Sequence, residues 1–224
     1  MAEKEVQTTS SKLGAFIEKN RTIFIVLLIL VLSFVLGYVI TSVILNNSKN
    51  KTLEAIDQIS FELTDKGMNL SEDEITQRAD AALEKLAAYT KKSGIAGARA
   101  NMLCADITFN QKKYSESFDY WKATATKAKK AYTAPIAYYN MGVCAEQLNK
   151  TEDAAENYKL AAGFKDFVLF AHAKYNYGRI LETQGKYAEA VETYNQIGDK
   201  LPNDVWAKLA KSRVLALKAE GKAE

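Results

Sequence analysis

The sequence has very little of the chemistry that enzymes and metal proteins use. Its 224 residues include one histidine, His172, and two cysteines, Cys104 and Cys144. A metal site or a catalytic triad needs partners for that histidine, and the cysteines stand 28 and 68 residues before it. No G-x-S-x-G, P-loop or C-x-x-C motif occurs. The sequence therefore predicts no enzyme, no metal site and no cofactor.

Cysteine content also excludes a disulfide scaffold, which needs several bridges in a short chain. We interpret Cys104 and Cys144 as two small buried apolar residues. An oxidised pair outside the cytoplasm remains an alternative, and it requires closely placed Cβ atoms.

Strong charge of one sign is absent as well. The net charge is +3, from 30 basic and 27 acidic residues, which is too small to predict nucleic-acid binding. No segment alternates apolar and polar residues as a strand does, so we expect an all-α fold. Nothing predicts a small-molecule substrate, and the remaining partners are proteins or peptides.

One long apolar run stands apart from the rest of the chain. Residues 22–45 contain no charge, and as a helix these 24 residues span roughly 36 Å, enough for a bilayer core. A buried core helix would be unusually long. The apolar region of a cleaved signal peptide covers about 7–15 residues, followed by a small-x-small site that residues 46–55 do not supply. The run predicts a retained membrane anchor that spans once.

Basic residues predict the orientation of this anchor. Four precede the run, and Lys49 and Lys51 follow it closely; the four are Lys4, Lys12, Lys19 and Arg21. An excess of Lys and Arg marks the cytoplasmic side. We therefore expect a cytoplasmic N-terminus and a soluble part in the periplasm or another extracytoplasmic space.

An internal repeat organises the C-terminal half. Three positions recur after 36 residues: Gly142 and Gly178, Ala154 and Ala190, Tyr158 and Tyr194. One step earlier the spacing is 37, with Ala105, Ser117 and Trp121 at the same places. Gly221 also lies 36 residues after Gly185, so the last segment resembles one more first helix, which would cap the open end of the stack.

The order of small residue, turn, small residue, aromatic and proline is typical of tetratricopeptide repeats. The chain resembles that family at Tyr177, Gly178, Ala190, Tyr194 and Pro202. The resemblance implies that small and aromatic residues pack inside each repeat. These packing residues are Ala105, Trp121, Gly142, Ala154, Tyr158, Gly178, Ala190, Tyr194 and Pro202.

The resulting expectation is an all-α solenoid behind one transmembrane helix. The expected parts are a cytoplasmic tail (1–21), the span (22–45), a connector with a divergent helix pair (46–96), three regular repeats (97–202) and a capping helix (203–224). In the divergent pair, a polar connector at 46–50 precedes helices at 51–66, closed by Gly67 and Asn69, and 71–92. Ser71 and Glu74 predict a capping box, and Thr151 an N-cap.

The tetratricopeptide resemblance also implies a binding groove, because first helices line the inner wall in that family. The implied positions are Arg99, Met102, Asp106, Phe109, Ile136, Tyr139, Val143, Glu146, His172, Tyr175, Arg179, Glu182, Lys208 and Lys211. Such a mixed wall suits an extended or helical peptide. Members that clamp a C-terminal carboxylate use Lys and Asn where this chain has other residues, so that ligand is not expected.

The whole layout is similar to the YfgM-like family of bacterial inner-membrane proteins. That resemblance implies a periplasmic repeat domain that accompanies the Sec translocon and links it to periplasmic chaperones. Three readings remain open at this point. The chain is either a scaffold that docks chaperones or secreted clients, or a structural building block of an envelope assembly. A cytoplasm-facing receptor is a third reading.

Overall fold

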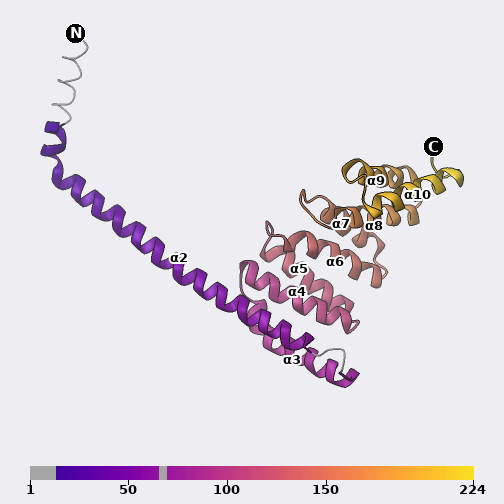
Figure 1. Cartoon of the computed structure of the whole chain (residues 1–224), viewed down its shortest axis with the longest axis horizontal. Helices are drawn as coiled ribbons and strands as arrows, with labels where there is room; N and C mark the ends of the chain where they lie inside the picture. Colours follow the sequence, from indigo (N-terminus) through magenta and orange to yellow (C-terminus); the bar gives the residue numbers. More distant parts are fainter. Residues whose placement is uncertain (1–13, 66–69) are drawn as a thin grey trace, which may run out of the picture. The chain divides into compact units, whose positions relative to one another are not determined.

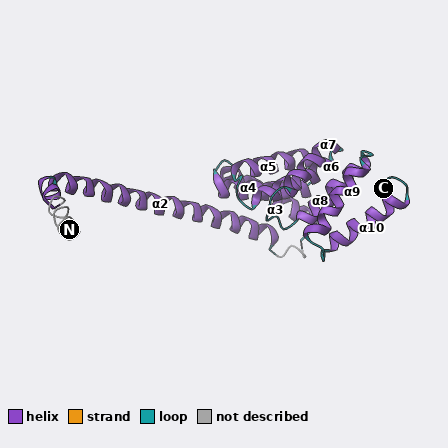
Figure 2. Cartoon of the chain, turned by 90° about the horizontal axis from the view of Figure 1, so that it is seen from above, coloured by secondary structure: helices purple, strands orange, loops and turns teal. Residues whose placement is uncertain are grey.

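The computed structural model describes residues 14–65 and 70–224, and within them every regular element is a helix (Figures 1 and 2). The chain divides into two compact units, Met1–Lys51 and Thr52–Glu224. The expected turn at Gly67 and Asn69 lies outside the described residues. The long helix α2 (Arg21–Thr64) belongs to both units.

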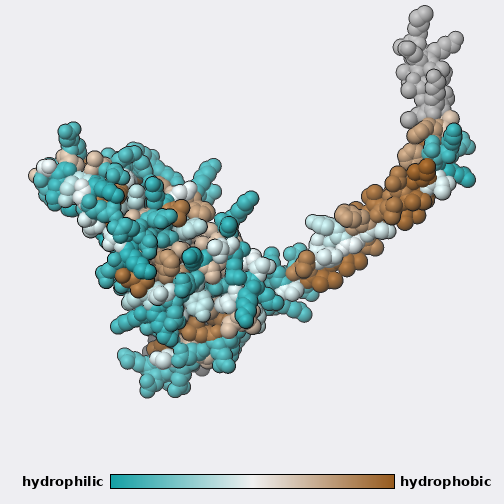
Figure 3. Space-filling view, turned by 180° about the vertical axis from the view of Figure 1, so that it is seen from behind, coloured by the Kyte–Doolittle hydropathy of each residue, from teal (hydrophilic) through white to brown (hydrophobic). Residues whose placement is uncertain are grey.

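In the first unit, α2 is exposed along its apolar residues. Phe34 is 78% exposed and Leu36 is 62% exposed, and Figure 3 shows hydrophobic side chains as a brown band along this helix. Among the described residues, α2 alone is long and apolar enough to cross a membrane. A signal sequence meets the same criterion of length and composition.

The polar connector expected at residues 46–50 is helical instead, so that expectation was wrong. Helix α2 continues without interruption through Asn50 and ends at Thr64. Residues 46–50 contain no proline or glycine, and their three asparagines and one serine each disfavour a helix by only up to about 0.7 kcal/mol, which does not break it.

The second unit opens with the last turns of α2 packed on α3 (Glu72–Thr90). Ile56 and Ile59 of α2 are buried in one cluster with Ala82 and Leu86 of α3, as their helical spacing favours. Helix α3 begins with the predicted capping box. Ser71 accepts a hydrogen bond from the Glu74 backbone, and the Glu74 carboxylate accepts one from the Ser71 backbone.

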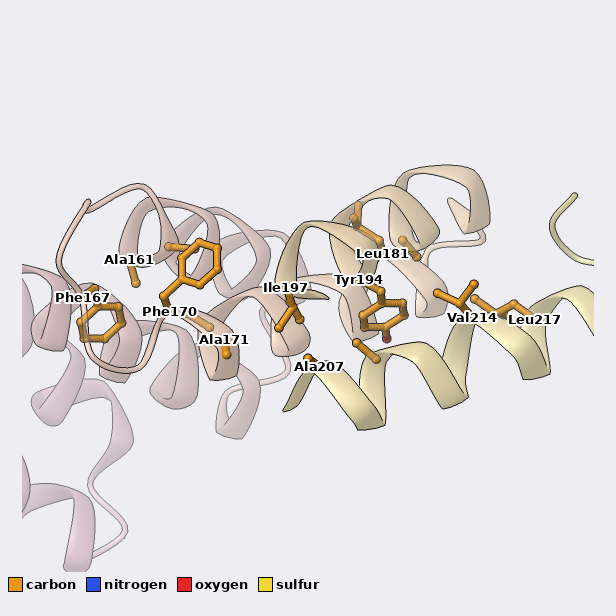
Figure 4. Packing of buried hydrophobic residues seen from close by; sticks show 14 residues of the cluster. Ala161, Phe167, Phe170, Ala171, Leu181, Tyr194, Ile197, Ala207, Val214 and Leu217 are labelled. Carbon is orange, nitrogen blue, oxygen red and sulfur yellow. The ribbon is translucent and has the colours of Figure 1, made fainter. Parts of the chain in front are cut away.

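Three helix pairs follow and a single helix closes the stack. The pairs are α4 (Gly94–Asn110) with α5 (Tyr114–Lys127), α6 (Thr133–Gln147) with α7 (Thr151–Ala162), and α8 (Phe170–Thr183) with α9 (Tyr187–Lys200). Helix α10 (Val205–Ala219) packs on the last pair. Its Ala207, Val214 and Leu217 share a buried cluster with Tyr194 and Ile197 of α9, shown in Figure 4.

Each first helix ends in the same backbone motif. A residue with positive φ recurs after α4, α6, α8 and α10, at Lys112 (61°), Asn149 (57°), Gly185 (74°) and Gly221 (68°). The next residue donates its N–H to the carbonyl five residues before it, as from Lys186 to Leu181 over 2.9 Å. This is the bond of a Schellman cap. The motif therefore marks the 36–37-residue period at four points.

The second helices begin differently from the expectation at Thr151. That residue is the first of α7, and Lys150 holds the cap position without a side-chain hydrogen bond. The N-cap residue that follows each Schellman turn is a lysine before α5, α7 and α9 alike: Lys113, Lys150 and Lys186. The sequence cue at Thr151 misplaced the helix start by one residue.

Candidate functional site

Tyrosine, glutamate and arginine form a bonded triplet between the second and third repeats. The hydroxyl of Tyr158, on α7, donates to Glu146 Oε2 on α6 over 2.7 Å. Arg179 of α8 donates to both oxygens of the same carboxylate, at 2.6 and 2.8 Å. Glu146 thereby ties its own repeat together and links it to the next one. Both bonds come from one guanidinium nitrogen, Nη2, and charge-assisted bonds of this kind are stronger than neutral ones.

The same triplet recurs one repeat later. Tyr194 donates to Glu182 Oε1 over 2.6 Å, and Arg213 Nε donates to Glu182 Oε2 over 2.7 Å. Burial, followed by the hydrogen bond to a carboxylate, raises the pKa of both Tyr158 and Tyr194. We call these six residues the Tyr–Glu–Arg ladder. It binds α6 to α8 and α8 to α10.

The ladder and one further ion pair engage four of the seven Asp, Glu, Lys and Arg residues expected to line a groove. Glu146, Arg179 and Glu182 are its members, and Arg99 pairs with Asp57 of α2 at 2.5 Å. These side chains are engaged with neighbouring helices. Their arrangement indicates that they hold the first helices in register, which leaves the aromatic residues as the groups best placed to contact a ligand.

Four aromatic residues of three first helices lie together. The ring of His172 stacks on Trp206 with centroids 4.1 Å apart and planes 16° apart. Tyr175 lies 5.2 Å from Trp206, and Tyr139 lies 5.2 Å from His172. We call Tyr139, His172, Tyr175 and Trp206 the aromatic wall. All four side chains are half-buried, so each keeps some surface toward solvent.

Hydrogen bonds hold the centre of this wall. The Tyr139 hydroxyl lies 3.2 Å from the ring nitrogens of His172, and Asn176 Nδ2 donates to that hydroxyl over 3.3 Å. Burial lowers the pKa of His172 and raises that of Tyr139. Both changes favour the neutral form near neutral pH. The wall therefore presents uncharged aromatic surface, which suits apolar side chains and peptide groups.

The other apolar groove positions are mostly part of the core. Met102, Phe109 and Ile136 are half-buried against the cluster around Trp121, and Val143 packs against the cluster around Tyr158. They support the first helices and offer only part of their surface to a ligand.

Asp106 differs from these neighbours because its side chain is exposed. Neighbouring protein atoms still remove part of the water around its carboxyl group, and this desolvation raises the pKa of Asp106 to about 6. This acid titrates closer to neutral pH than an ordinary surface aspartate.

Lys208 and Lys211 stand apart from the aromatic wall. They line a cavity of about 680 Å³ between α9 and α10, together with Tyr194, Asp199 and Pro202. The constant step of 36 residues led to these two lysines. The structure instead places Trp206 and Arg213 beside His172 and Glu182, 34 and 31 residues further along the chain. A shift of register in the last helix therefore hid both residues from sequence reasoning.

The expected packing residues lie inside their repeats, with one exception. Ala105, Trp121, Ala154, Tyr158, Ala190 and Tyr194 are between 0% and 2% exposed, whereas Pro202 is exposed in the turn between α9 and α10. Cys104 and Cys144 are buried free thiols, and burial raises the pKa of Cys104 to about 12. Both cysteines thus behave as the small buried residues expected from the sequence. Among the described residues, no cluster of three His, Cys, Asp or Glu side chains suits a metal ion.

Stacked helix pairs with small residues at their contacts define an α-solenoid, a class of interaction module. Residues 160–205 match the tetratricopeptide repeat family. A TPR repeat-containing protein of Treponema pallidum (strain Nichols) is 34% identical over 141 residues, which are 63% of this chain. The chain spans 59% of the length of that relative. The chain thus carries tetratricopeptide repeats in an all-helical solenoid, a fold used as a scaffold for protein–protein interaction.

Among solved structures, a Rap protein complexed with competence and sporulation factor is similar. It is 23% identical, with a TM-score of 0.49, and the match covers 61% of this chain and 40% of the other.

Proposed function

We propose that this chain is a membrane-anchored scaffold that holds protein partners beside a membrane. In this proposal residues 22–45 of α2 cross the bilayer, residues 1–21 are cytoplasmic, and the solenoid works outside the cytoplasm. Residues 46–96 connect the anchor to the regular repeats at 97–202, and residues 203–224 cap them. The partners are chaperones or secreted clients near a translocation machine.

The exposed apolar surface of α2 supports the anchor. A helix that is apolar on every face is unfavourable in water, where each exposed side chain forgoes its burial energy. The excess of basic residues before residue 22 supports the orientation. A tether also confines the repeats near the membrane, which raises their effective concentration toward chains that emerge there.

The aromatic wall is the observation that carries the binding proposal. His172, Tyr175 and Trp206 form a half-buried aromatic group on α8 and α10, and the Tyr–Glu–Arg ladder fixes those two helices relative to each other. Rings that are already held in place lose little conformational entropy when a ligand binds. Their large apolar surfaces can contact many different peptide sequences. This chemistry suits a scaffold that receives many clients.

Site-specific photocrosslinking in native membranes tests the proposal. A photoreactive aromatic residue replaces Tyr175 on the wall, or Leu160 as a control, because Leu160 is 43% exposed on α7 outside the wall. We expect the residue at 175 to capture secreted or envelope proteins that the residue at 160 does not capture. Equal adducts at both positions would remove the wall from the binding site. Wall adducts containing only cytoplasmic proteins would contradict the extracytoplasmic placement.

One surface favours the alternative of a structural building block. The last helix exposes large apolar residues, with Val205 and Leu215 each 60% exposed and Leu209 44% exposed. Exposed apolar surface of this kind on a helix is a place where a further helix can pack. In that case the crosslinking result would differ. A photoreactive residue in place of Leu209 would capture copies of this chain or another envelope component, and the photoreactive residue at position 175 would capture no partner.

A further inference from the structure

Two loops between successive helix pairs meet at one edge of the repeat domain. Residues 91–93 join α3 to α4, and residues 128–132 join α5 to α6. The ammonium group of Lys127 donates to the backbone oxygen of Lys92 over 3.1 Å, which places the two loops side by side. In Figure 1 the helix pairs stack one after another, so the connections from one pair to the next lie on the same edge of the stack.

This edge carries positive charge without nearby acids in the sequence. Lysines occupy five positions, 91, 92, 127, 129 and 130, and residues 86–105 and 120–145 contain no Asp or Glu. In the part of the chain that the structure describes, none of the five forms an ion pair within 4.0 Å. Tyr132 stands among them with 61% of its surface exposed. We call these five lysines and Tyr132 the lysine edge.

The chain enters the repeat domain at this same edge. The α2 segment in the second unit, residues 52–64, runs antiparallel to α3. Near its end, Glu62 pairs with Lys85 at 2.7 Å and Asp65 accepts a hydrogen bond from Arg78. The beginning of the segment, at Thr52, therefore lies toward the end of α3, where Lys91 and Lys92 follow.

Chain length then limits how far this entry point lies from the apolar run. Thr52 follows Leu45 by seven residues, which span about 10 Å as a helix. The headgroup layer itself is about 5–8 Å thick on each side of the hydrocarbon core. Thr52 is thus at most about one Debye length from the headgroups at moderate salt, and Lys91 and Lys92 follow the end of α3 on the same side of the repeat domain.

We propose that the lysine edge binds anionic lipid headgroups and holds the repeat domain against the membrane. This inference rests on the proposed anchor in residues 22–45. Clustered lysines next to a span are attracted by an anionic lipid surface. An exposed tyrosine such as Tyr132 suits the boundary between headgroups and acyl chains, since its ring is apolar and its hydroxyl polar. With this edge bound, the repeats would lie beside the bilayer rather than swing freely from it.

The test uses the full chain in lipid nanodiscs and a fluorophore on Ser93→Cys in the first loop. The native thiols are buried, so the introduced cysteine is the accessible one. Quenching by a headgroup-labelled lipid reports how close the loop lies to the bilayer. We expect stronger quenching in discs that contain phosphatidylglycerol than in discs of phosphatidylcholine alone, and we expect salt to weaken it.

Two matched variants locate the effect. The edge variant carries K91Q, K92Q, K129Q and K130Q, and leaves Lys127 in place because it bonds the Lys92 carbonyl. The control variant carries K112Q, K113Q, K150Q and K186Q, which remove the same charge from exposed lysines at the opposite ends of the helices. The edge variant should lose the dependence on anionic lipid, and the control variant should keep it.

Each other outcome contradicts a defined claim. Equal quenching in both lipid compositions, or equal loss in both variants, would overturn the lysine edge as a lipid-binding surface. Co-elution with the discs is measured separately. A chain that does not enter the discs would overturn the anchor itself, and the lipid contact with it. Entry without any dependence on lipid charge would leave the anchor intact and refute only the lysine edge.

Discussion

Tyr194 fills the space that a side chain at position 178 would need. A Cβ atom added to Gly178 would lie 2.6 Å from Cε1 of Tyr194, closer than real Cβ contacts allow. The pair recurs one repeat earlier, where a Cβ at Gly142 would lie 2.8 Å from the ring of Tyr158. The glycine lets the first and second helices approach until the tyrosine hydroxyl reaches its glutamate. The close approach of the two helices and the hydrogen bond of the tyrosine in the Tyr–Glu–Arg ladder therefore both depend on the glycine of each repeat.

Gly178→Ala should consequently destabilise the repeat domain. The added methyl group must push against the ring of Tyr194, and overpacking of this kind costs about 1–3 kcal/mol. Gly198→Ala on α9 is the control, because nothing lies within 4 Å of a Cβ at that position. The control should be neutral or stabilising by up to about 1 kcal/mol, from its better helix propensity. Urea denaturation of the purified protein measures both, and an equally small effect of both substitutions would refute the close contact.

Arg213→Met should destabilise more than Lys85→Met, although each removes the basic partner of an ion pair; Arg213 also loses a longer, exposed contact with Glu220. The Glu182 side chain is 10% exposed beside Arg213, whereas Glu62 is 47% exposed beside Lys85. Loss of a partner at a nearly buried carboxylate leaves a poorly solvated charge, while exposed pairs contribute about 0–1 kcal/mol. The denaturation midpoints of the two variants give the comparison. Equal midpoints would show that water replaces Arg213 without cost.

Pairs such as Tyr194 with Glu182 were beyond the reach of sequence reasoning. The repeat period placed each tyrosine inside its repeat, because large aromatic residues at helical spacing predict a core. The period could not reveal that Glu146 and Glu182 would be bonded by arginines of the following helix. That contact depends on how successive helices cross. Arg179 and Glu182, which were expected in a charged groove, are members of the ladder in this fold.

Ala190→Leu should be costly where Ala188→Leu is not. Ala190 is fully buried between the helices of the third repeat, and Ala188, two residues earlier, is exposed. A leucine at 190 would overpack the contact at a cost of about 1–3 kcal/mol, while a leucine at an exposed helix position costs little. Thermal unfolding followed by circular dichroism measures the difference. Similar unfolding temperatures for the two variants would mean that the helix register is incorrect.

Local sequence signals succeeded where neighbouring residues alone decide the structure. The capping box at Ser71 and Glu74 formed as predicted, because both partners lie within one turn. The Schellman turns at Lys112 and Asn149 were not predicted, because neither residue is glycine. Glycine identified only the equivalent turns at Gly185 and Gly221. Their shared period of 36–37 residues is the signal that could have identified them.

Asp106 makes stability depend on pH in a defined direction. Burial raises its pKa to about 6, so the folded protein binds this proton more tightly than the unfolded chain, whose aspartates titrate near about 3.9. Stability should therefore fall as the pH rises from about 4 to about 6, and remain lower above that range. Asp106→Asn removes this part of the dependence and should raise the denaturation midpoint at about pH 7 but not at about pH 4. Asp119→Asn, on the exposed side of α5, is the control and should change neither midpoint.

The membrane topology is tested by reporters at the two ends of the chain. The basic residues before residue 22 predict that the N-terminus stays in the cytoplasm, so a phosphatase that folds only outside the cytoplasm should be active after Glu224 and inactive before Met1. Four changes, Lys4→Gln, Lys12→Gln, Lys19→Gln and Arg21→Gln, remove the bias and should lower the activity of the C-terminal fusion. The same substitutions at Lys112, Lys113, Lys150 and Lys186 remove equal charge far from the span and should not. N-terminal sequencing of the membrane-bound fusion should begin within residues 1–21. A shorter protein that starts beyond residue 45 and is released from the membrane would instead identify the apolar run as a cleaved signal sequence.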